Sequence, residues 1–284
     1  MFINYMYKNL VTVYKNLYLS AQMWGITMNQ TILECKNICF SYHNLNGETK
    51  ALTDISFQVN KGEFLAIVGP SGCGKSTLLS IIAGLLTPES GEVILDEQNK
   101  LRIGYMLQQD HLLEWRTIWK NVLLGPEITR SLTSEKEHLA QKLLTDYGLI
   151  KFKDKKPGEL SGGLKQRAAL IRTMVMEPGL LLLDEPFSAL DYQTRLMVSA
   201  DIGNIIRASG ITAILITHDL SEAISLADRI LVLTRRPATI KKNIPVHLTL
   251  SDDSPLAARN APEFNDLFTL LWKEISDEYC GENC

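Results

Sequence analysis

The sequence predicts an α/β fold built around a parallel sheet. Short apolar runs of about strand length recur at residues 64–68, 180–183, 211–216 and 230–233. Their apolarity is continuous rather than alternating, which is typical of strands covered on both faces. Segments with helical spacing lie between these runs, and strands that alternate with helices favour a parallel arrangement.

The composition of the 284-residue chain indicates a folded protein with little electrostatic bias. Its hydrophobic fraction is 45%, which supplies a sizeable core, and its formal net charge is −3. Because the charges are spread along the chain, we expect no nucleic-acid partner and no direct attraction to an anionic membrane. Five cysteines without paired-motif spacing favour the reduced thiols of a cytosolic protein over a disulfide framework.

Residues 1–29 are expected to form a separate N-terminal extension. They are rich in Tyr, Asn and Lys, and polar residues interrupt their apolar stretches. That pattern differs from a signal peptide and falls short of the ~20 apolar residues of a membrane span. We interpret the segment as disordered or as a wrongly assigned start, with Met23 or Met28 as the true one. A partner-binding or membrane-surface arm is the alternative.

The main domain is expected over residues 30–235, with a tail over 236–284. Residues from about 110 to 165 contain no strand-like run and predict a helical subdomain. Inside it, Ser134 and the Glu three residues later match a capping box, and Gly148 marks the helix end. Four prolines punctuate the tail, which is predicted to finish in a helix near residues 264–275.

The stretch GPSGCGKST follows the first strand run and matches the phosphate-loop pattern G-x-x-x-x-G-K-[ST] in the required strand–loop–helix context. Backbone N–H groups and the following helix N-terminus would surround a phosphate. Lys75 would reach the β- and γ-phosphates, Ser76 would coordinate Mg²⁺, and Thr77 would contact the α-phosphate. The predicted nucleotide-binding residues of this loop are Gly69, Pro70, Ser71, Gly72, Cys73, Gly74, Lys75, Ser76 and Thr77.

Cys73 lies inside this loop and has two interpretations. We favour a spacer whose backbone N–H matters, and the alternative is a redox-sensitive thiol that can block the site. Because a helix N-terminus lowers the pKa of a thiol, alkylation of Cys73 is expected to be able to inactivate the protein in either case.

A second motif, LLLLDEP at residues 180–186, is an apolar strand that ends in two adjacent acids. Asp184 would hold Mg²⁺ through its water shell, and Glu185 would accept a proton from the attacking water. The guanine-reading pattern N-K-x-D of GTPases is absent, and nothing suggests the acceptor site of a kinase. The pair of acids therefore favours an ATPase.

The stretch LSGGLKQR at residues 160–167 separates the chain from other phosphate-loop proteins. Ser161, Gly162 and Gly163 would open a helix and offer a hydroxyl, two unshielded amides and a helix-dipole end. This makes a second phosphate-binding surface, although one γ-phosphate does not need two such surfaces from one subunit.

With this motif the sequence resembles the ATP-binding subunits of ABC transporters, in which the signature of one subunit covers the ATP on the phosphate loop of the other. The resemblance runs from about residue 31 to residue 233, with the family's motifs in order. SALD ends at Asp191 and matches the loop that communicates across the dimer. THD places His218 where the family's switch histidine contacts the γ-phosphate.

Two further motifs complete the resemblance. YMLQQD matches the Q-loop, and alignment points to Gln108 rather than Gln109 as the residue that touches Mg²⁺ and the water. Upstream, CFSY supplies Tyr42 for stacking on adenine, with Phe40 as the alternative. Taken alone, His218 could be a core histidine and Asp191 a helix cap; the motif order favours the family roles.

The resemblance implies a P-loop NTPase (RecA-like) core with a parallel sheet, an antiparallel β edge and a helical subdomain. It also implies that the cofactors are ATP and Mg²⁺, that two copies form a homodimer, and that hydrolysis drives a separate integral-membrane permease. An extracellular or periplasmic solute-binding protein would act indirectly. The subunit is then expected at the cytoplasmic side of the membrane as a peripheral protein.

The segment DHLLEWRT resembles the LLPW stretch of nitrate, sulfonate, taurine and thiamine-precursor importers, and RRPATI resembles their RPGRI tail. Glu114 stands where proline is usual, and Ala238 stands where glycine is usual. The competing hypothesis is a soluble ABC ATPase, such as a translation or cluster-assembly factor. Translation factors usually carry two ATPase domains, whereas this chain has one phosphate loop.

Overall fold

The computed structural model describes residues 30–44, 47–96, 101–250 and 255–280. It divides the chain into two units, Met1–Thr31 and Ile32–Cys284. The first described strand begins at Thr31, the last residue of the first unit, and the other described helices and strands belong to the second unit. The expectations for residues 1–29 lie outside the described residues.

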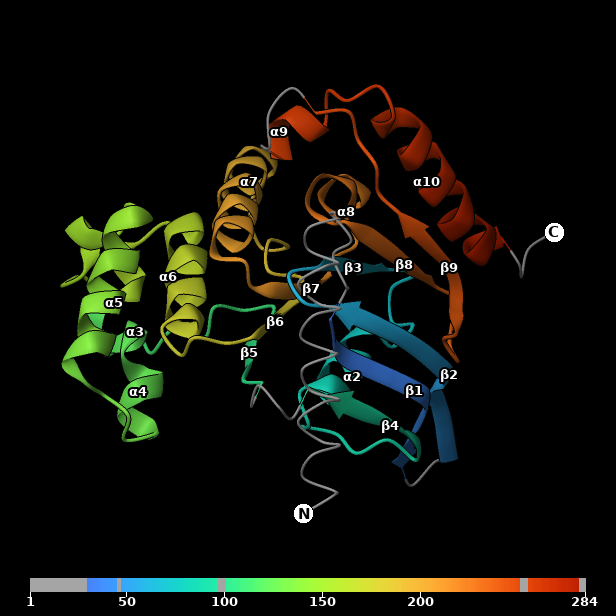
Figure 1. Cartoon of the computed structure of the whole chain (residues 1–284), viewed down its shortest axis with the longest axis horizontal. Helices are drawn as coiled ribbons and strands as arrows, with labels where there is room; N and C mark the ends of the chain where they lie inside the picture. Colours follow the sequence, from blue (N-terminus) through green and yellow to red (C-terminus); the bar gives the residue numbers. More distant parts are fainter. Residues whose placement is uncertain (1–29, 45–46, 97–100, 251–254, 281–284) are drawn as a thin grey trace, which may run out of the picture. The chain divides into compact units, whose positions relative to one another are not determined.

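Within the described ranges, a six-stranded sheet forms the centre of the unit (Figure 1). Neighbouring strands are parallel from β5 to β8, and β9 runs antiparallel to β8. The predicted apolar runs are its four central strands, which confirms the parallel α/β core. In spatial order the strands are β5 (Ile103–Met106), β6 (Leu180–Asp184), β7 (Thr212–Ile216), β3 (Phe64–Val68), β8 (Arg229–Leu233) and β9 (Ile240–Pro245).

The two faces of this sheet are covered by different cores. On β3, Phe64, Ala66 and Val68 belong to one hydrophobic core, while Leu65 and Ile67 belong to the other. All five residues of the strand are buried. Burial on both sides explains why these strands appear in the sequence as continuous apolar runs.

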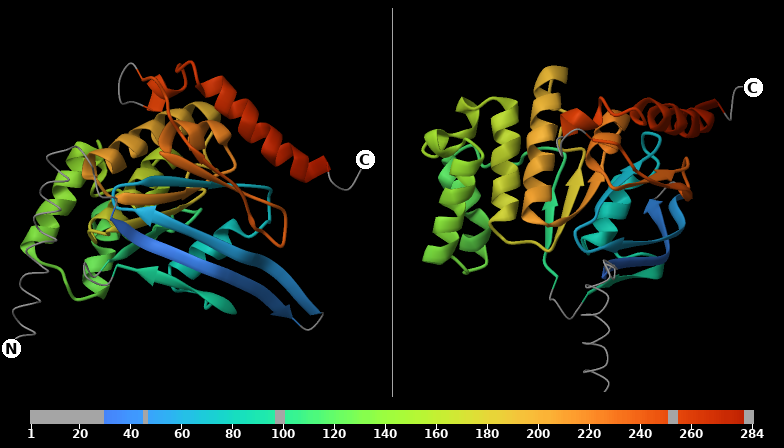
Figure 2. Two further views of the ribbon diagram at one scale, coloured as in Figure 1. Left: turned by 45° about the vertical axis from the view of Figure 1, so that its right-hand side comes forward. Right: turned by 45° about the horizontal axis from the view of Figure 1, so that its top comes forward.

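Among the described elements, one face carries a smaller sheet and the helix α2 (Lys75–Ile82). In the described part of the chain the smaller sheet has the order β2 (Gly47–Asn60), β1 (Thr31–Asn44) and β4 (Ser90–Leu95), and β1 and β4 are antiparallel. This is the predicted antiparallel β edge. Figure 2 shows it on the side of the large sheet away from the other helices.

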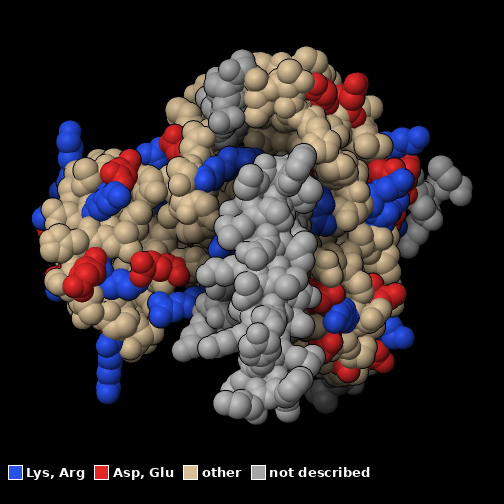
Figure 3. Space-filling model, viewed as in Figure 1, with Lys and Arg blue, Asp and Glu red and all other residues tan. Residues whose placement is uncertain are grey.

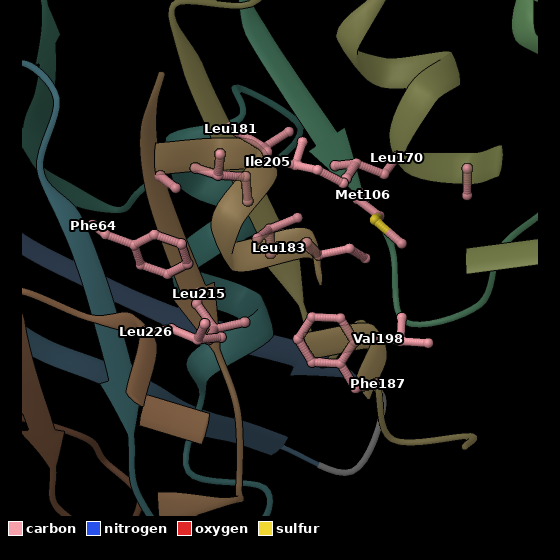
Figure 4. Close-up of a cluster of buried hydrophobic side chains, with 14 of the residues drawn as sticks. Phe64, Met106, Leu170, Leu181, Leu183, Phe187, Val198, Ile205, Leu215 and Leu226 are labelled. Atoms are coloured by element: carbon pink, nitrogen blue, oxygen red, sulfur yellow. The ribbon is translucent and has the colours of Figure 1, made fainter. Parts of the chain in front are cut away.

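The opposite face carries the long helices α6 (Gly162–Met174), α7 (Tyr192–Ser209) and the shorter α8 (Leu220–Leu226). Figure 4 shows how side chains of β3, β7 and α8 meet there through Phe64, Leu215 and Leu226. The cluster fixes α6 and α7 against the sheet, and both helices begin at predicted functional motifs.

The predicted helical subdomain is helical throughout its regular structure. It contains α3 (Ile118–Val122), α4 (Leu124–Ile128), α5 (Ser134–Asp146) and two short 3-10 helices, η2 (Ile150–Phe152) and η3 (Pro157–Glu159).

The predicted start of α5 is wrong by one residue. Thr133, not Ser134, is the N-cap, because its backbone is extended and its hydroxyl accepts the N–H of Lys136. Ser134 is already helical. Gly148 does end the segment, with a φ of +71° that suits glycine.

The tail pairs with the main sheet through β9 and continues into α9 (Pro255–Ala258) and α10 (Phe264–Cys280). The last helix is longer than predicted. Its Leu271 is fully buried in the core that α8 shares. On β9, Lys241 Nζ lies 3.5 Å from Glu274 Oε2 and 3.0 Å from Glu278 Oε1.

On the face seen in Figure 3, the charged side chains of the described residues do not gather into one large patch of a single sign. Basic and acidic side chains are interspersed there. Among the helices of the described ranges, none has both the length and the apolar character that crossing a bilayer requires.

Candidate functional site

The predicted phosphate loop and catalytic residues follow neighbouring parallel strands at the same edge of the sheet. The phosphate loop comes after β3, and Asp184 ends β6 with Glu185 next to it. His218 follows β7, and Gln108 follows β5. Because the strands are parallel, their carboxyl ends lie together, which is where α/β sheets bind ligands. The topology therefore places these motifs at one site.

The phosphate loop needs glycine at two tightly packed positions. A Cβ on Gly74, whose φ is +124°, would lie 2.9 Å from Leu52 Cδ2 and 3.1 Å from the carbonyl oxygen of Ala51. A Cβ on Gly69 would lie 2.9 Å from the carbonyl oxygen of Leu233. The pattern glycines thus let the loop pack against β2 and β8 while it turns into α2.

Lys75 points into its own loop. The side chain is buried, and Nζ donates to the carbonyl oxygens of Gly69 and Pro70, each at 2.9 Å. A buried ammonium held by two neutral acceptors retains a strong preference for an anion. The loop is therefore positively charged at its centre, as a phosphate site requires.

The thiol of Cys73 is 1% exposed, and burial raises its pKa above the ordinary value despite the nearby charge of Lys75. The expectation of a lowered pKa was wrong because desolvation outweighs the positive surroundings. Burial of the Cys73 thiol favours the spacer interpretation over the redox-sensitive one.

Asp184 and Ser76 form a direct pair beside the loop. Ser76 Oγ donates to Asp184 Oδ1 at 3.0 Å, and the Tyr105 hydroxyl donates to Oδ2 at 3.4 Å. Asp184 is 7% exposed, and burial raises its pKa, with the charge of Glu185 adding to the effect. A hydroxyl and a desolvated carboxylate at this spacing fit the oxygen ligands that Mg²⁺ prefers.

Glu185 meets the two other predicted catalytic residues. Its Oε2 lies 3.2 Å from His218 Nδ1 and 3.4 Å from Gln108 Nε2. Its φ is +44°, in the left-handed region that a glutamate rarely adopts, and its N–H donates to the carbonyl oxygen of Ile216 at 2.9 Å. This turn at the end of β6 directs the carboxylate toward His218.

The two aromatic candidates differ in exposure. Tyr42 is 42% exposed, and its hydroxyl lies 3.0 Å from Thr77 Oγ1. Phe40 packs against the core of the smaller sheet, and the two rings meet edge to face with centroids 5.0 Å apart. Tyr42 is therefore the better placed of the two to offer a ring face beside the phosphate loop.

The signature residues open α6, as predicted. Ser161 is the N-cap with an extended backbone, and a Cβ on Gly163 would lie 2.9 Å from Val198 Cγ2 on α7. A Cβ on Gly162 would lie 3.0 Å from Leu190 Cδ2. Close packing against α7 and the loop before it therefore requires glycine here.

The sheet separates the signature from the phosphate loop within one chain. Helix α6 packs in the core on one face of the large sheet, and α2 packs in the core on the other. Figures 1 and 2 show the two helices apart. The fold brings together the phosphate loop, Gln108, the two acids and His218, and it places Ser161, Gly162 and Gly163 on the opposite face.

Asp191 is the N-cap of α7, since its Oδ1 accepts the N–H of Thr194 at 3.1 Å. The side chain of Thr194 is the largest cause of the lowered pKa of Asp191, and the hydrogen bond from the Thr194 backbone N–H lowers it further. The helix-cap alternative from the sequence is therefore present in the structure, and it leaves the Asp191 side chain at the surface.

Several residues of the site carried no separate signal in the sequence. Tyr105 contacts Asp184, and Ser188 Oγ lies 3.3 Å from Gln108 Nε2. Thr217 and Glu222 form a buried hydrogen bond behind His218. Each lies in or beside a recognised motif, but only its position in the fold distinguishes it from a neighbouring polar residue.

Comparison with known proteins gives the same family throughout. The sequence profile described as ABC transporter matches residues 52–188. The uncharacterised ABC transporter ATP-binding protein YtlC of Bacillus subtilis is 44% identical, over 87% of this chain and 96% of the relative. The taurine import ATP-binding protein TauB of Roseobacter denitrificans is 37% identical, over 88% and 97%.

A similar solved structure is the ATP-binding cassette MJ0796, determined as a dimer in a post-hydrolysis state bound to ADP and Pi. It aligns with a TM-score of 0.64 and 29% identity, covering 76% of this chain and 99% of that one. Fold, motif order and these relatives agree, and the chain therefore belongs to the ABC transporter family as an ATP-binding subunit.

Proposed function

We propose that this ABC transporter ATPase binds ATP and Mg²⁺ between two copies of the chain and hydrolyses the nucleotide to power import through a separate membrane permease. The observation that carries the proposal is the meeting of Glu185, His218 and Gln108 beside a phosphate loop with a buried lysine. Three strand ends supply the three side chains, so the fold itself assembles them.

The nucleotide would lie along the phosphate loop. Backbone N–H groups of residues 69–77 and the N-terminus of α2 would bind the phosphates, with Lys75 at the β- and γ-positions and Thr77 at the α-position. Tyr42 would exchange its contact with Thr77 for stacking on adenine. Binding of ATP would therefore replace the contacts of Lys75 within the loop and the contact of Tyr42 with Thr77.

Hydrolysis would be carried out by the group around Glu185. Glu185 would accept a proton from the attacking water, Gln108 would orient that water, and His218 would contact the γ-phosphate. Ser76, Gln108 and Asp184 would hold Mg²⁺, which supplies charge neutralisation on the phosphates when bound. The burial of Asp184 makes its carboxylate a stronger cation ligand than an exposed one.

The second copy would complete each site. Ser161, Gly162 and Gly163 lie on the opposite face of the sheet from α2, so they would serve the nucleotide of the partner in a head-to-tail dimer. Asp191 would lie in the loop that communicates across this dimer. The dimeric state of the related ADP- and Pi-bound cassette supports this arrangement.

We further propose that the imported solute is a small anion or a vitamin precursor, and that the chain lies at the cytoplasmic side of the membrane as a peripheral subunit. Related proteins named for taurine and for nitrate import support the solute class. The helical subdomain over residues 110–165 would contact the permease, and a solute-binding protein would deliver the solute to it.

The catalytic proposal is tested with Glu185→Gln. The variant keeps the side-chain shape and loses the base, so we expect ATP binding to persist and turnover to fall by roughly 10³-fold or more. Binding is measured by nucleotide titration and turnover by phosphate release. Substantial remaining hydrolysis would remove Glu185 as the base.

The transport proposal is tested on the complex with the permease and binding protein reconstituted in vesicles. We expect ATP hydrolysis to rise with one solute among taurine, other sulfonates, nitrate and vitamin precursors, and not with the rest. Purification of the chain with ribosomes instead of a permease would support the soluble alternative.

A further inference from the structure

A buried polar chain lies directly behind His218. Thr217 is 2% exposed and Glu222 is 3% exposed. The Thr217 hydroxyl donates to Glu222 Oε2 at 2.6 Å and accepts the N–H of Asp219 at 3.0 Å. The backbone amide that follows His218 is thus tied, through one hydroxyl, to a carboxyl group in the interior.

The rest of this turn is fixed on both sides of His218. Before it, the N–H of Thr217 donates to the carbonyl oxygen of Ile67 on β3 at 3.4 Å. After it, Asp219 caps α8 by accepting the N–H groups of Ser221 and Glu222. His218 is therefore the exposed residue of a short turn between the buried strand β7 and the start of α8. Hydrogen bonds on both sides of His218 fix the orientation of this turn.

Burial of a carboxyl group lowers the stability of a protein, because the group loses its hydration. Glu222 lies in α8 among apolar residues of the main core, and an apolar side chain would fill the same volume. Its bond to Thr217 is the polar contact that its position makes possible. The hydrogen bond to Thr217 links the buried Glu222 to the turn that carries His218.

Charges on three neighbouring elements act on Glu222. Asp219 at the start of α8 raises its pKa, and Arg195 of α7 and Arg259 of the segment after α9 lower it. Burial is the largest cause, and the pKa of Glu222 is raised to about 7. Near neutral pH this carboxyl group therefore gains or loses a proton, and the bond to Thr217 can run in either direction.

We propose that Glu222 and Thr217 are positioning residues for His218, and that their hydrogen-bonded chain to the Asp219 amide keeps the histidine within reach of Glu185 and the γ-phosphate. This inference rests on the proposed function. Protonation of Glu222 would change its hydrogen bond with Thr217 and thereby the position of the turn. The rate of hydrolysis would then depend on pH in the neutral range, although Glu222 does not contact the nucleotide.

The test uses the full chain and three substitutions. Thr217→Val removes the hydroxyl at nearly constant volume, Thr217→Ser restores it, and Glu222→Gln keeps an acceptor that does not titrate in this range. Thr212→Val is the matched control, because Thr212 is a buried threonine at the first residue of β7, the strand that Thr217 follows, and its hydroxyl accepts the N–H of Gly62. Phosphate release gives kcat and the KM for ATP from pH 6 to 9.

We expect Thr217→Val to lower kcat by roughly 10- to 100-fold with little change in KM, because misplacement of a reacting group affects mainly the chemical step. Thr217→Ser should regain most of the rate, and Thr212→Val should lower the unfolding temperature without changing kcat. The wild type should change its kcat around pH 7, and Glu222→Gln should remove that change.

A double-mutant cycle separates positioning from a general loss of stability. In a His218→Ala background, Thr217→Val should cost nothing further, because its effect passes through the histidine. An equal loss in both backgrounds, or a wild-type kcat for Thr217→Val, would overturn the positioning role. An unchanged pH profile in Glu222→Gln would overturn the role of its proton, and this variant decides the matter where Thr217→Val does not fold.

The same experiment distinguishes this inference from the proposed function. If His218→Ala itself hydrolyses ATP at the wild-type rate, the proposed role of His218 is wrong. If His218→Ala loses activity while the Thr217 and Glu222 variants keep it, the proposed function stands and only the positioning role fails.

Discussion

Asp184 and Glu185 are adjacent in the sequence and have different surroundings. Asp184 is almost fully buried and its pKa is raised by that burial, whereas the Glu185 side chain is 23% exposed and faces Gln108 and His218. The left-handed backbone of Glu185 produces this divergence, because the Asp184 carboxylate points toward Ser76 and the Glu185 carboxylate toward Gln108 and His218. Two identical functional groups can therefore take two roles.

Glu222 makes protein stability depend on pH. Its pKa is raised from 4.5 to about 7 in the folded state, so the folded chain binds more protons than the unfolded chain between these values. Its contribution is full below about pH 4.5 and is lost as the pH rises through about 7. Urea unfolding measures the free energy of unfolding at pH 5 and pH 8. Between these pH values, that of Glu222→Gln should rise relative to that of the wild type by up to roughly 3 kcal/mol. An equal difference at both pH values would contradict the assignment.

Cys73 should be a slow target for alkylation in the folded protein. Its thiol is buried and its pKa is raised, whereas Cys39 is only partly buried. With N-ethylmaleimide at neutral pH, mass spectrometry of peptides should find Cys39 modified well before Cys73, and denaturation should remove the difference. Faster modification of Cys73 in the native protein would restore the reactive-thiol interpretation.

At the scale of elements, the sequence predicted helices and strands most accurately where burial produces a simple pattern of apolar residues. The central strands are apolar throughout because both faces are covered, and the helical subdomain shows no strand pattern. The start of α5 at Thr133 could not be distinguished from Ser134, since both are good caps and only backbone geometry decides.

Contacts between residues far apart in the sequence were also beyond what local sequence patterns could predict. The catalytic group was predicted from motifs on separate strands, and the parallel order of β5, β6 and β7 explains why these motifs meet. The bonds from Tyr105 to Asp184 and from Thr217 to Glu222 depend on how elements pack, which no local pattern contains. The docking of α10 on the core likewise comes from tertiary contacts.

Helix α10 should be held to the sheet in part by Lys241. This side chain is 22% exposed and lies within ion-pair distance of Glu274 and Glu278, whereas Lys242 is 52% exposed and 3.9 Å from Glu274. Lys241→Ala should lower the free energy of unfolding by about 1 kcal/mol and speed amide exchange in α10, because the pair is partly shielded from water. The matched control Lys242→Ala should change neither by a measurable amount.

At the scale of the whole described unit, the large sheet keeps the two phosphate-binding surfaces apart. The phosphate loop opens α2 on one face, and the signature opens α6 on the other. Under the proposed function, the two motifs of one chain would therefore bind two different nucleotides. Two copies in head-to-tail orientation would unite them, and ATP would then be part of the interface.

The most direct test is a cross-link between different subunits. One population carries Ser161→Cys, a second carries Ser71→Cys, and both carry Glu185→Gln so that bound ATP is retained. An oxidant should give a disulfide-linked dimer when the two are mixed with ATP and Mg²⁺, and neither population alone, nor Glu185→Gln without added cysteines, should give it. A linked dimer without ATP, or no link when the same two cysteine variants with Glu185 intact still hydrolyse ATP cooperatively, would contradict the shared site.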